Sequence, residues 1–301
     1  MKADTGWLPM PKTIVAVGEA LWDVFPDGRR PGGAPCNVAF HAARLGDRGV
    51  IVTRVGEDAA GDELVAFLRE RGVNTDHVQR DGTRPTGTVL VTIEDSEPQY
   101  AITEAVAWDY IAAEDDARAL MRTADAICVG SLAQRSEASC AAIRQLLSDA
   151  RGQALVVFDV NLRPPFIDAE VIDATFRFAD VVKISEPEVA RLSTLLDRPS
   201  LVGWLLESVG VQSVWVTRGA GGASVTTRQG TVSAPGVVID TSTGDAVGAG
   251  DAFTAAMVHQ LVHNATPQEA LKAANRYAAL VATKKGAMPV VSSDELAGIG
   301  F

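Results

Sequence analysis

Cysteine is scarce in this chain of 301 residues, which holds only Cys36, Cys128 and Cys140, far apart and without a Cys-x-x-Cys pair. An odd, scattered set argues against a disulfide framework and favours a reducing compartment, so we expect the protein in the cytosol. Long apolar runs are also missing: none reaches 18 residues, and the run Ile14 to Val17 is too short for a signal-peptide core. We therefore expect no membrane partner.

Positive charge is in deficit, with 27 Lys and Arg against 38 Asp and Glu and a formal net charge of −11. This balance argues against broad electrostatic capture of nucleic acid or anionic lipid, so any anionic ligand needs a local site. The composition, 47% hydrophobic and 22% charged, is that of a folded globular protein. Disordered, collagenous and coiled-coil classes are excluded.

The common nucleotide-binding motifs are missing. There is no Gly-Lys dipeptide and hence no Walker A loop, and neither the HRD nor the DFG of protein kinases occurs. The segment GAGDAF at Gly248 to Phe253 begins like a dinucleotide fingerprint, but Phe253 replaces the third glycine and the segment lies far from the first βα unit. A Rossmann dehydrogenase therefore fits poorly, and no Gly-x-Ser-x-Gly elbow indicates a hydrolase.

Two histidines, His259 and His263, stand four residues apart on a predicted helix, which is the spacing of a zinc protease. Gln260, however, occupies the position of the general-base glutamate. We interpret the pair as helix-surface histidines near a favourable C-terminal dipole. A metallohydrolase is the alternative that a chelator and a metal assay would test.

Short apolar runs rich in β-branched residues predict buried strands, and helical patterns lie between them. Strand and helix alternation of this kind implies a parallel sheet with helices on both faces. The predicted strands cover 13–17, 50–55, 126–130, 154–159, 180–184 and 213–217, and the predicted helices cover 37–45, 62–71, 137–150, 187–196 and 201–209.

One region breaks the alternation, because residues 86–93 and 99–103 flank the polar turn 94–98 and predict a β-hairpin. Such a hairpin can project from the main sheet and, with residues 21–30, cover its crevice. A lid over the crevice and a decorative surface hairpin are both open at this point.

The stretch Gly248-Ala249-Gly250-Asp251 carries the strongest chemical signal. An apolar helical stripe follows it, which places Gly-Ala-Gly in the turn before a helix and Asp251 at its first residues. Small residues and a helix N-terminus together make an anion hole. Asp251 then either caps the helix or accepts a proton from a hydroxyl while the hole stabilises a transferring phosphoryl group.

Two segments, GGAPCNVAFHAARLG at Gly32 to Gly46 and GAGDAF at Gly248 to Phe253, resemble the two signature segments of the ribokinase/PfkB family of carbohydrate kinases. The resemblance covers essentially the whole chain, with five further matches at 55–64, 158–165, 181–188, 217–222 and 273–287. It implies a ribokinase-like fold, an α/β/α sandwich of three layers with a mostly parallel central sheet and a small β lid. The chain would be a single kinase domain, 1–301, with discontinuous lid insertions at about 20–31 and 84–104.

The same resemblance implies the roles of individual residues at the reacting end of the site. Asp251 matches the catalytic base, and Gly248, Ala249 and Gly250 match the residues whose backbone N–H groups bind the γ-phosphate. The sugar would contact Gly33, Asn37 and Asp23, the last matching an acidic residue that ends the first strand. For Asn37 a helix cap is the alternative.

Further matches imply the nucleotide side and a D-x-N-x-R segment. Asn161 and Arg163 of that segment, which begins at Asp159, would meet substrate or phosphate, with a surface ion pair as the alternative for Arg163. Nucleotide contacts are implied for Thr217, Gly219 and Gly222 of a T-x-G-x-x-G turn, and for Asn275 near adenine. A tight β-turn is the alternative for the glycines.

The chain departs from the family pattern twice. The family's N-x-x-E motif, tied to Mg²⁺ and phosphate, is Ser185 to Glu188 here, so Glu188 is kept as the metal-site residue and the asparagine is lost. The family usually reads D-T-x-G-A-G-D here, and the first three positions of that motif are Asp245-Ala246-Val247 in this chain. A separate Asp240-Thr241 pair lies upstream. This loop binds potassium in some members, which leaves K⁺ open.

The resemblance thus implies an ATP-dependent, Mg²⁺-requiring kinase that acts on a primary hydroxyl of a small sugar. Fructose is the first choice, because the GGAP and FDVNLRPP segments look most like those of fructokinases. The alternatives are 2-keto-3-deoxygluconate kinase, whose substrate carboxylate would suit Arg163, then ribokinase and nucleoside kinases. From another class, a non-catalytic sugar- or nucleotide-binding protein would fit Ser185 and the altered loop. The partners implied are sugar and ATP, with a homodimer through the lid.

Overall fold

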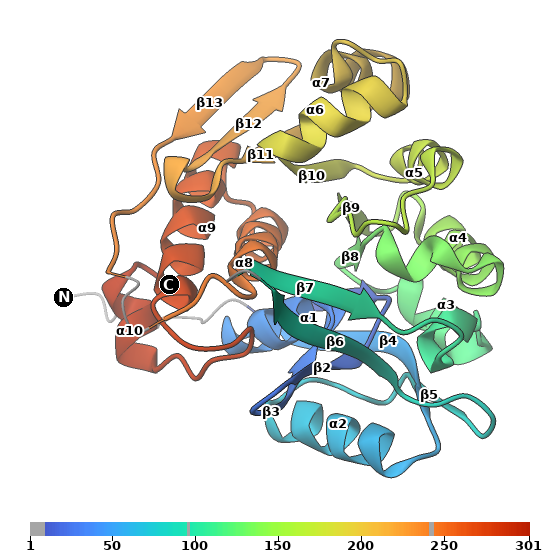
Figure 1. Cartoon of the computed structure of the whole chain (residues 1–301). Helices are drawn as coiled ribbons and strands as arrows, with labels where there is room; N and C mark the ends of the chain where they lie inside the picture. Colours follow the sequence, from blue (N-terminus) through green and yellow to red (C-terminus); the bar gives the residue numbers. More distant parts are fainter. Residues whose placement is uncertain (1–9, 95–96, 241–243) are drawn as a thin grey trace.

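A nine-stranded sheet forms the centre of the computed structural model, which describes residues 10–94, 97–240 and 244–301 (Figure 1). Its strand order is β13-β12-β11-β10-β9-β8-β1-β4-β5. The strands from β11 to β5 in this order are parallel, whereas β12 and β13 add an antiparallel edge. The parallel strands are β1 (Thr13–Val17), β4 (Arg48–Gly56), β5 (Val78–Asp81), β8 (Ala126–Val129), β9 (Leu155–Asp159), β10 (Val181–Ser185) and β11 (Ser213–Thr217); the edge strands are β12 (Ala223–Thr227) and β13 (Gly230–Ala234).

Six of these strands are those that the apolar runs predict. They are buried on both faces, because helices cover both sides of the sheet. The patterns missed β5, β12 and β13. Strand β5 has the sequence VQRD, which contains no apolar run, and most residues of β13 are exposed. Neither strand therefore carries the signal of a buried strand.

Helices form a layer on each face of the sheet (Figure 1). Alternate residues of β1 show the division, since Ile14 and Ala16 pack in one core and Val15 and Val17 in the other. The first layer holds α1 (Ala34–Arg44), α2 (Ala59–Glu70), α8 (Ala249–Val262) and α9 (Pro267–Ala282), with α10 (Ser293–Gly298) beside it. The second holds α3 (Asp115–Met121), α4 (Glu137–Ala150), α5 (Ala169–Phe176), α6 (Glu186–Leu195), and α7 (Leu201–Trp204) with its π-helical continuation Leu205–Val209. The predicted three-layer arrangement is confirmed.

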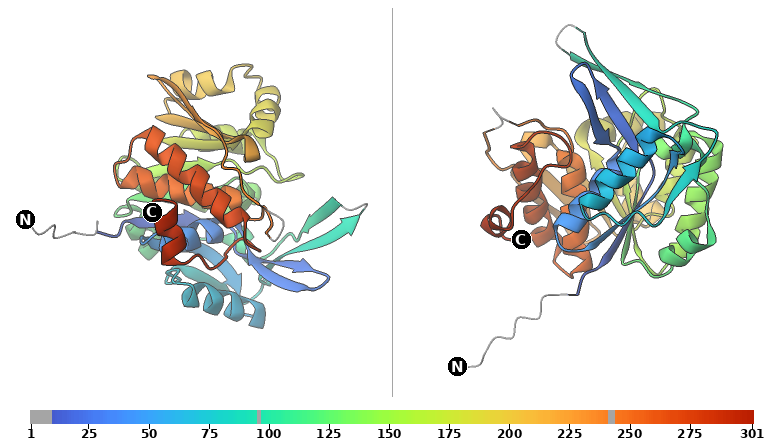
Figure 2. Two further views of the ribbon diagram at one scale, coloured as in Figure 1. Left: turned by 90° about the vertical axis from the view of Figure 1, so that its left-hand side faces the viewer. Right: turned by 90° about the horizontal axis from the view of Figure 1, so that it is seen from below.

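A second, four-stranded sheet projects from this body in both views of Figure 2. Its order is β3-β2-β6-β7, with β2 (Leu21–Phe25) parallel to β6 (Gly87–Glu94), and with β3 (Gly28–Gly32) and β7 (Glu97–Ile102) antiparallel to their neighbours. The predicted hairpin is confirmed; residues 95–96 of its turn lie outside the described residues. The Trp22 indole donates a hydrogen bond of 2.9 Å to the Ala60 carbonyl, which attaches the small sheet to α2.

Strand β1 is the point where the chain changes direction across the main sheet. It pairs with β4 on one side and β8 on the other, both in parallel. In open parallel sheets, ligands bind at the carboxyl ends of the strands beside such a point. The fold therefore places a candidate site where β1, β8, β9 and β10 end, beneath the small sheet. Within the described ranges, no helix combines the length and the apolar character that crossing a bilayer requires.

Candidate active site

A cavity of about 680 Å³ opens at the carboxyl ends of the strands. Glu19 follows β1, Asn161 and Arg163 follow β9, and Asp251 lies in the first turn of α8; all line this cavity. The small sheet forms one wall with Leu21, Asp23, Val89 and Ile102, and Gly33 and Asn37 at the start of α1 form another. The residues that the sequence assigned to sugar binding are thus gathered around one space.

Asp251 lies where α8 begins. Gly248 is the N-cap with φ of 76°, and a Cβ there would lie 2.6 Å from the Ala287 Cα, so only glycine fits. The helix starts at Ala249, so Ala249 and Gly250 are helical residues. The turn, expected to run through Gly250, therefore ends two residues earlier, at Gly248. The Asn37 amide donates a hydrogen bond of 2.6 Å to the Asp251 Oδ2. Asn37 therefore does not cap α1. Instead it orients the carboxylate of Asp251, a residue 214 positions away in the sequence.

Three carboxyl groups of this cavity have raised pKa values. Burial raises the pKa of Glu19 to about 7, of Asp23 to about 6 and of Asp251 to about 6. The Arg163 guanidinium lowers all three, and the Asn37 hydrogen bond also lowers that of Asp251, without cancelling the effect of burial. Carboxyls poised near neutral pH in one cleft are a mark of acid–base chemistry.

A buried ion pair holds α8 against the sheet. The Lys183 ammonium lies 3.0 and 3.1 Å from the two carboxylate oxygens of Asp159, and the Thr254 hydroxyl donates to Asp159 Oδ2 at 2.7 Å. Burial alone would lower the pKa of Lys183, but the charges of Asp159, Asp251 and Glu188 outweigh it and raise it. Lys183 also lies 3.5 Å from the position of a Cβ on Gly250, so it places a fixed positive charge beside the anion hole.

A second cavity, of about 510 Å³, lies on the other side of the anion hole. Thr217, Gly219 and Gly222 line it at the end of β11, with Asn275 and a row of alanines from α9, and Val237 and Val238 from the segment after β13. Gly222 has φ of 89°, and a Cβ there would lie 2.3 Å from the Ala234 carbonyl oxygen, so the turn demands glycine. The Asn275 amide donates to the carbonyls of Ala234 and Pro235, which fixes this wall. All the residues expected at the nucleotide therefore line one cavity.

The two cavities meet at Ala246 and Gly250, which line both. The backbone N–H groups at the α8 N-terminus thus lie between a largely apolar cavity and one rich in carboxylates and amides. A phosphate chain that extends from the first cavity would reach these N–H groups, with Asp251 on the far side. The arrangement suits transfer of a group between ligands held in the two cavities.

Neighbouring segments hold the anion-hole loop in place. The buried His41 of α1 hydrogen-bonds the Tyr277 hydroxyl (2.9 Å) through Nδ1 and the Ala287 carbonyl (3.0 Å) through Nε2. Ala287 in turn packs directly on Gly248. The Asp245 carboxylate accepts hydrogen bonds from the backbone N–H groups of Val247 and Gly286. Thr241, part of the shifted Asp-Thr pair, lies outside the described residues.

Glu188 is engaged within the protein. Its Oε2 accepts from the Ser185 N–H (2.8 Å) and hydroxyl (2.6 Å) in a capping box of α6, and its Oε1 accepts from the Leu162 N–H at 2.6 Å. Glu188 thereby fixes the loop that carries Asn161 and Arg163. It does not line either cavity, and its Mg²⁺ role stays a prediction.

Two details of the sequence interpretation are wrong. Asp23 does not end the first strand, because β1 stops at Val17 and Asp23 lies in β2 of the small sheet. His259 and His263 are not free on a helix surface, because each side chain is only 16% exposed and hydrogen-bonds the buried Asp47. The pattern of the segment 18–33, with its exposed polar residues, did not reveal a strand pair.

The sequence interpretation also missed Glu19, Lys183 and His41. A lysine inside the buried run VVKIS was a usable signal, because lysine is almost never fully buried without a partner. Glu19 directly follows a buried strand, which is a second usable signal. For His41 the sequence offered none, since its partners lie 236 and 246 residues away.

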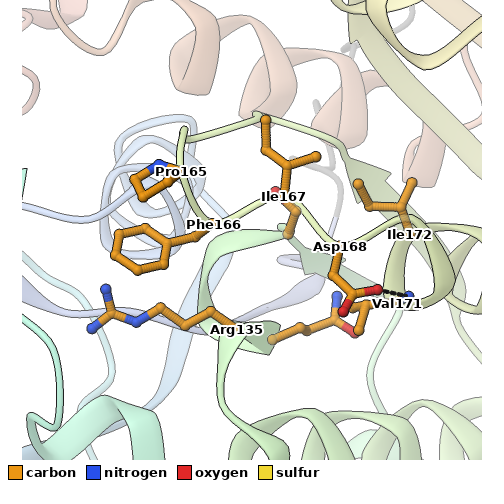
Figure 3. A pocket seen from close by; sticks show the side chains of 9 residues that line it. Arg135, Pro165, Phe166, Ile167, Asp168, Val171 and Ile172 are labelled. Carbon is orange, nitrogen blue, oxygen red and sulfur yellow. Dashed lines mark hydrogen bonds between the residues drawn. The ribbon is translucent and has the colours of Figure 1, made fainter. Parts of the chain in front are cut away.

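A third, smaller cavity of about 200 Å³ lies between the 3₁₀ helix Leu132–Arg135 and the start of α5 (Figure 3). Its charged side chains are already engaged. Asp168 caps α5 by accepting from the N–H groups of Glu170 and Val171, and Arg135 pairs with Asp109 and stacks on Trp108 and Phe166. This cavity therefore offers less chemistry than the other two.

Two cavities adjoin at the switch point of a doubly wound sheet, one suited to a nucleotide and one lined by acidic side chains. This arrangement is typical of a phosphotransferase for a small hydroxylated acceptor. Comparison with known families makes this specific: the profile of the pfkB family carbohydrate kinases matches residues 18–294. The chain belongs to this family, and it is an ATP-dependent sugar kinase.

Individual relatives agree with this assignment. Fructokinase-2 of Zea mays is 30% identical over 307 residues, which covers 92% of this chain and 90% of that protein. The crystal structure of a fructokinase with bound ATP from Xylella fastidiosa superposes with a TM-score of 0.87 at 26% identity, covering 96% and 98% of the two chains. The fructokinase from Vibrio cholerae O395 with fructose, ADP and calcium ion gives 0.82 at 26%, covering 96% and 99%. A double mutant of that fructokinase was solved with fructose, ADP and potassium ion. The predicted ribokinase-like fold is confirmed.

Proposed function

We propose that this sugar kinase transfers the γ-phosphoryl group of ATP to a primary hydroxyl of fructose and forms fructose 6-phosphate. The observation that carries the proposal is the shared position of Gly250, which lines both cavities, with Asp251 next to it on the acid-lined side. ATP occupies the cavity of Thr217, Gly222 and Asn275. The sugar occupies the cavity beneath the small sheet.

The reaction then follows from the geometry. The Asp251 carboxylate accepts the proton of the attacking hydroxyl, whose oxygen forms a bond to the γ-phosphorus while the bond to the bridging oxygen of ADP breaks. The N–H groups at Gly248 and Gly250 stabilise charge on the transferring group, and that of Ala249 joins them on release of its 3.3 Å hydrogen bond to the Ala246 carbonyl. The fixed Lys183 ammonium beside Gly250 adds to this field. Positioning and electrostatics thus supply most of the rate enhancement.

Two buried acceptor atoms support a polyhydroxy substrate. Glu19 Oε2 and Asn37 Oδ1 have no hydrogen-bond partner among the described residues, and both residues line the acid-lined cavity. An unsatisfied buried acceptor is costly, and sugar hydroxyls are donors that could satisfy residues of this kind. Asp23 and Asn161 add further polar groups to the same walls. We therefore assign sugar binding to Glu19 together with Asp23, Gly33, Asn37, Asn161 and Arg163.

A Mg²⁺ ion that arrives with ATP would meet carboxylates that already have partners within the protein. Mg²⁺ keeps several waters and uses one or two carboxylates plus substrate phosphates. Here Asp159 is paired with Lys183 and Glu188 is hydrogen-bonded to Ser185 and Leu162, so Glu188 would act at most through water. When bound, Mg²⁺ neutralises charge on the phosphate oxygens. A K⁺ site in the loop of Asp245 to Val247 remains part of the proposal.

Two observations favour fructose over other sugars as the substrate. The GGAP and FDVNLRPP segments resemble those of fructokinases, and proteins named fructokinase are among the relatives. A second candidate, 2-keto-3-deoxygluconate, is favoured by Arg163, whose exposed side chain faces the cavity and forms no ion pair among the described residues. A substrate carboxylate could pair with this guanidinium.

Location and assembly belong to the same proposal. A cytosolic location is supported by Cys36, Cys128 and Cys140, which are free and buried. A homodimer through the small sheet is supported by Leu90 of β6, which is 50% exposed. Both stay predictions of the sequence.

The decisive experiment is an ADP-release assay with MgATP and a panel of fructose, 2-keto-3-deoxygluconate, ribose, glucose, tagatose and adenosine, with and without K⁺. We expect fructose to give the highest kcat/KM. A single strong response to another compound would replace fructose and keep the kinase. ATP binding without ADP release for any compound would instead favour a binding protein, and Asp251→Asn provides the inactive control.

A further inference from the structure

Two histidines and one aspartate meet at the opposite end of α8 from the anion hole. His259 Nδ1 lies 2.7 Å from Asp47 Oδ2, and His263 Nε2 lies 2.9 Å from Asp47 Oδ1. Each residue presents one ligand atom, and the three atoms lie within 4.8 Å of one another. The centroids of the two imidazole rings lie 4.6 Å apart, with the ring planes tilted by 49° to each other. We call Asp47, His259 and His263 the α8 triad.

The carboxylate of the α8 triad is buried without a permanent cation. The Asp47 side chain is 1% exposed, and no Lys or Arg ion pair reaches it among the described residues. The nearest lysine, Lys12, donates only its backbone N–H to Oδ1, since its ammonium pairs with Asp125. A buried carboxylate ordinarily requires a partner of opposite charge. Imidazole N–H groups supply donors to Asp47 in this arrangement, and a bound cation would supply a positive charge as well.

The surroundings of the triad favour a cation. Asp47 lies two residues after the C-cap of α1, and His263 is the C-cap of α8, so two helix C-termini point their negative ends here. The Phe301 ring, which carries no charge, also lies beside His259, with ring centroids 5.9 Å apart. The Lys12 N–H holds Asp47 in orientation, as outer-shell donors do for metal ligands.

We propose that the α8 triad binds a divalent transition cation such as Zn²⁺, through His259 Nδ1, His263 Nε2 and an Asp47 carboxylate oxygen. Two imidazoles and a carboxylate select borderline transition ions over Mg²⁺ and Ca²⁺, which prefer oxygen ligands. Water completes the coordination. Gln260 supplies no general base, so the site is structural: it joins the loop between α1 and β4 to the end of the helix that carries Asp251.

Tag-free protein, stripped with a chelator and dialysed, provides the test. Titration with Co²⁺ is expected to produce a visible d–d absorption that saturates at one equivalent, and Zn²⁺ is expected to abolish it. Zn²⁺ at 100 times its Kd is expected to raise Tm by roughly 5 °C, because it binds only the folded protein. Fructose kinase turnover is measured in parallel as a check on folding.

Matched variants locate the site. His263→Gln and Asp47→Asn are each expected to weaken Co²⁺ binding at least about tenfold, whereas His77→Gln, which alters a histidine paired with Asp116 elsewhere, is expected to bind normally. Should Asp47→Asn fail to fold, His263→Gln keeps the test valid. No Co²⁺ absorption, an equal signal in His263→Gln, or a Tm that depends on pH but not on Zn²⁺ would overturn the proposal, the last result in favour of protonated histidines.

Discussion

At the scale of single residues, Asp251 is held between two opposing effects. Burial disfavours its charged form, and the hydrogen bond from Asn37 favours it, with a resulting pKa of about 6. A base with this pKa is ionised at neutral pH and still able to retain a proton from a hydroxyl. The environment of Asp251 therefore suits a general base better than an ordinary surface carboxylate would.

Replacement of the base is the first prediction. Asp251→Asn keeps the size of the side chain and removes the proton acceptor, so we expect kcat to fall by about 10²–10⁴-fold. ATP binding, measured by calorimetry, should change little, because the backbone N–H groups are retained. Turnover near that of the wild type would remove Asp251 from the role of base.

The second prediction concerns pH. Asp251 acts when ionised, so kcat/KM should decline as the pH falls through about 6, the raised pKa of the free enzyme. Asn37→Ala removes a hydrogen bond that favours the ionised form, so the acid limb should move to higher pH. The measurement is a pH profile of kcat/KM for both proteins. An acid limb near pH 4 in the wild type would contradict the burial of Asp251.

At the scale of elements, the proposed anion hole also depends on two side chains that line neither of the two larger cavities. Burial lowers the pKa of His41 to about 4, so its ring is neutral, with Nε2–H donating to the Ala287 carbonyl and Nδ1 accepting from the Tyr277 hydroxyl. His41 and Tyr277 thus connect α1 and α9 to the segment that packs on Gly248. They are positioning residues.

Removal of this support is the third prediction. Tyr277→Phe leaves the His41 ring without its donor, and we expect kcat to fall about tenfold while the KM for sugar stays within about twofold, because small displacements of catalytic groups reduce the rate. Tyr110→Phe, remote from the anion hole, is the control. A change in stability without a change in kcat would reduce Tyr277 to a packing role.

Helix α6 gives the fourth prediction. Glu188→Gln removes a charged acceptor from the capping box and from the Leu162 N–H, at a cost of about 1 kcal/mol of unfolding free energy. If Glu188 also acts toward Mg²⁺, the concentration of Mg²⁺ for half-maximal activity should rise several-fold. Denaturant unfolding and a Mg²⁺ titration separate the two effects. An unchanged titration would leave Glu188 with its structural role alone.

At the scale of the whole molecule, residues from both sheets line the cavity to which we assign the sugar. Asp23 reaches the cavity from the small sheet, whereas Asp251 and Asn161 reach it from the main body. Gly32 makes room for Asp23, because a Cβ there would lie 2.3 Å from its Oδ2. Sugar binding should therefore depend on the small sheet more than ATP binding does.

The fifth prediction tests this division. Asp23→Ala should raise the KM for the sugar at least about tenfold, through loss of its hydrogen bonds, while the KM for ATP changes less than about twofold. Thr88→Ala, in β6 of the same sheet and outside the cavity lining, controls for loss of the sheet as a whole. Equal effects on both KM values would break the assignment of Asp23 to the sugar.

The sequence was informative where structure is local or repeated. Buried parallel strands have apolar runs in the sequence, and the GAGD segment indicates a helix start, so six strands and the start of α8 were predictable. Contacts such as Asn37 with Asp251 and His41 with Ala287 depend on how the whole chain folds, and no spacing encodes them. The family resemblance pointed to Asp23 and Asn275. It did not point to Glu19 or Lys183, for which the only signals were a position after a buried strand and a lysine within one.

Helix α8 connects the proposed phosphate site to the proposed cation site. Its first turn carries Gly250 and Asp251, and its C-terminal end carries His259 and His263, with about 21 Å of helix in total. Thermodynamic reciprocity then applies: any factor by which a cation at the triad tightens nucleotide binding equals the factor by which nucleotide tightens the cation. If such a coupling exists, the affinity for ATP would depend on the trace metal in the solution.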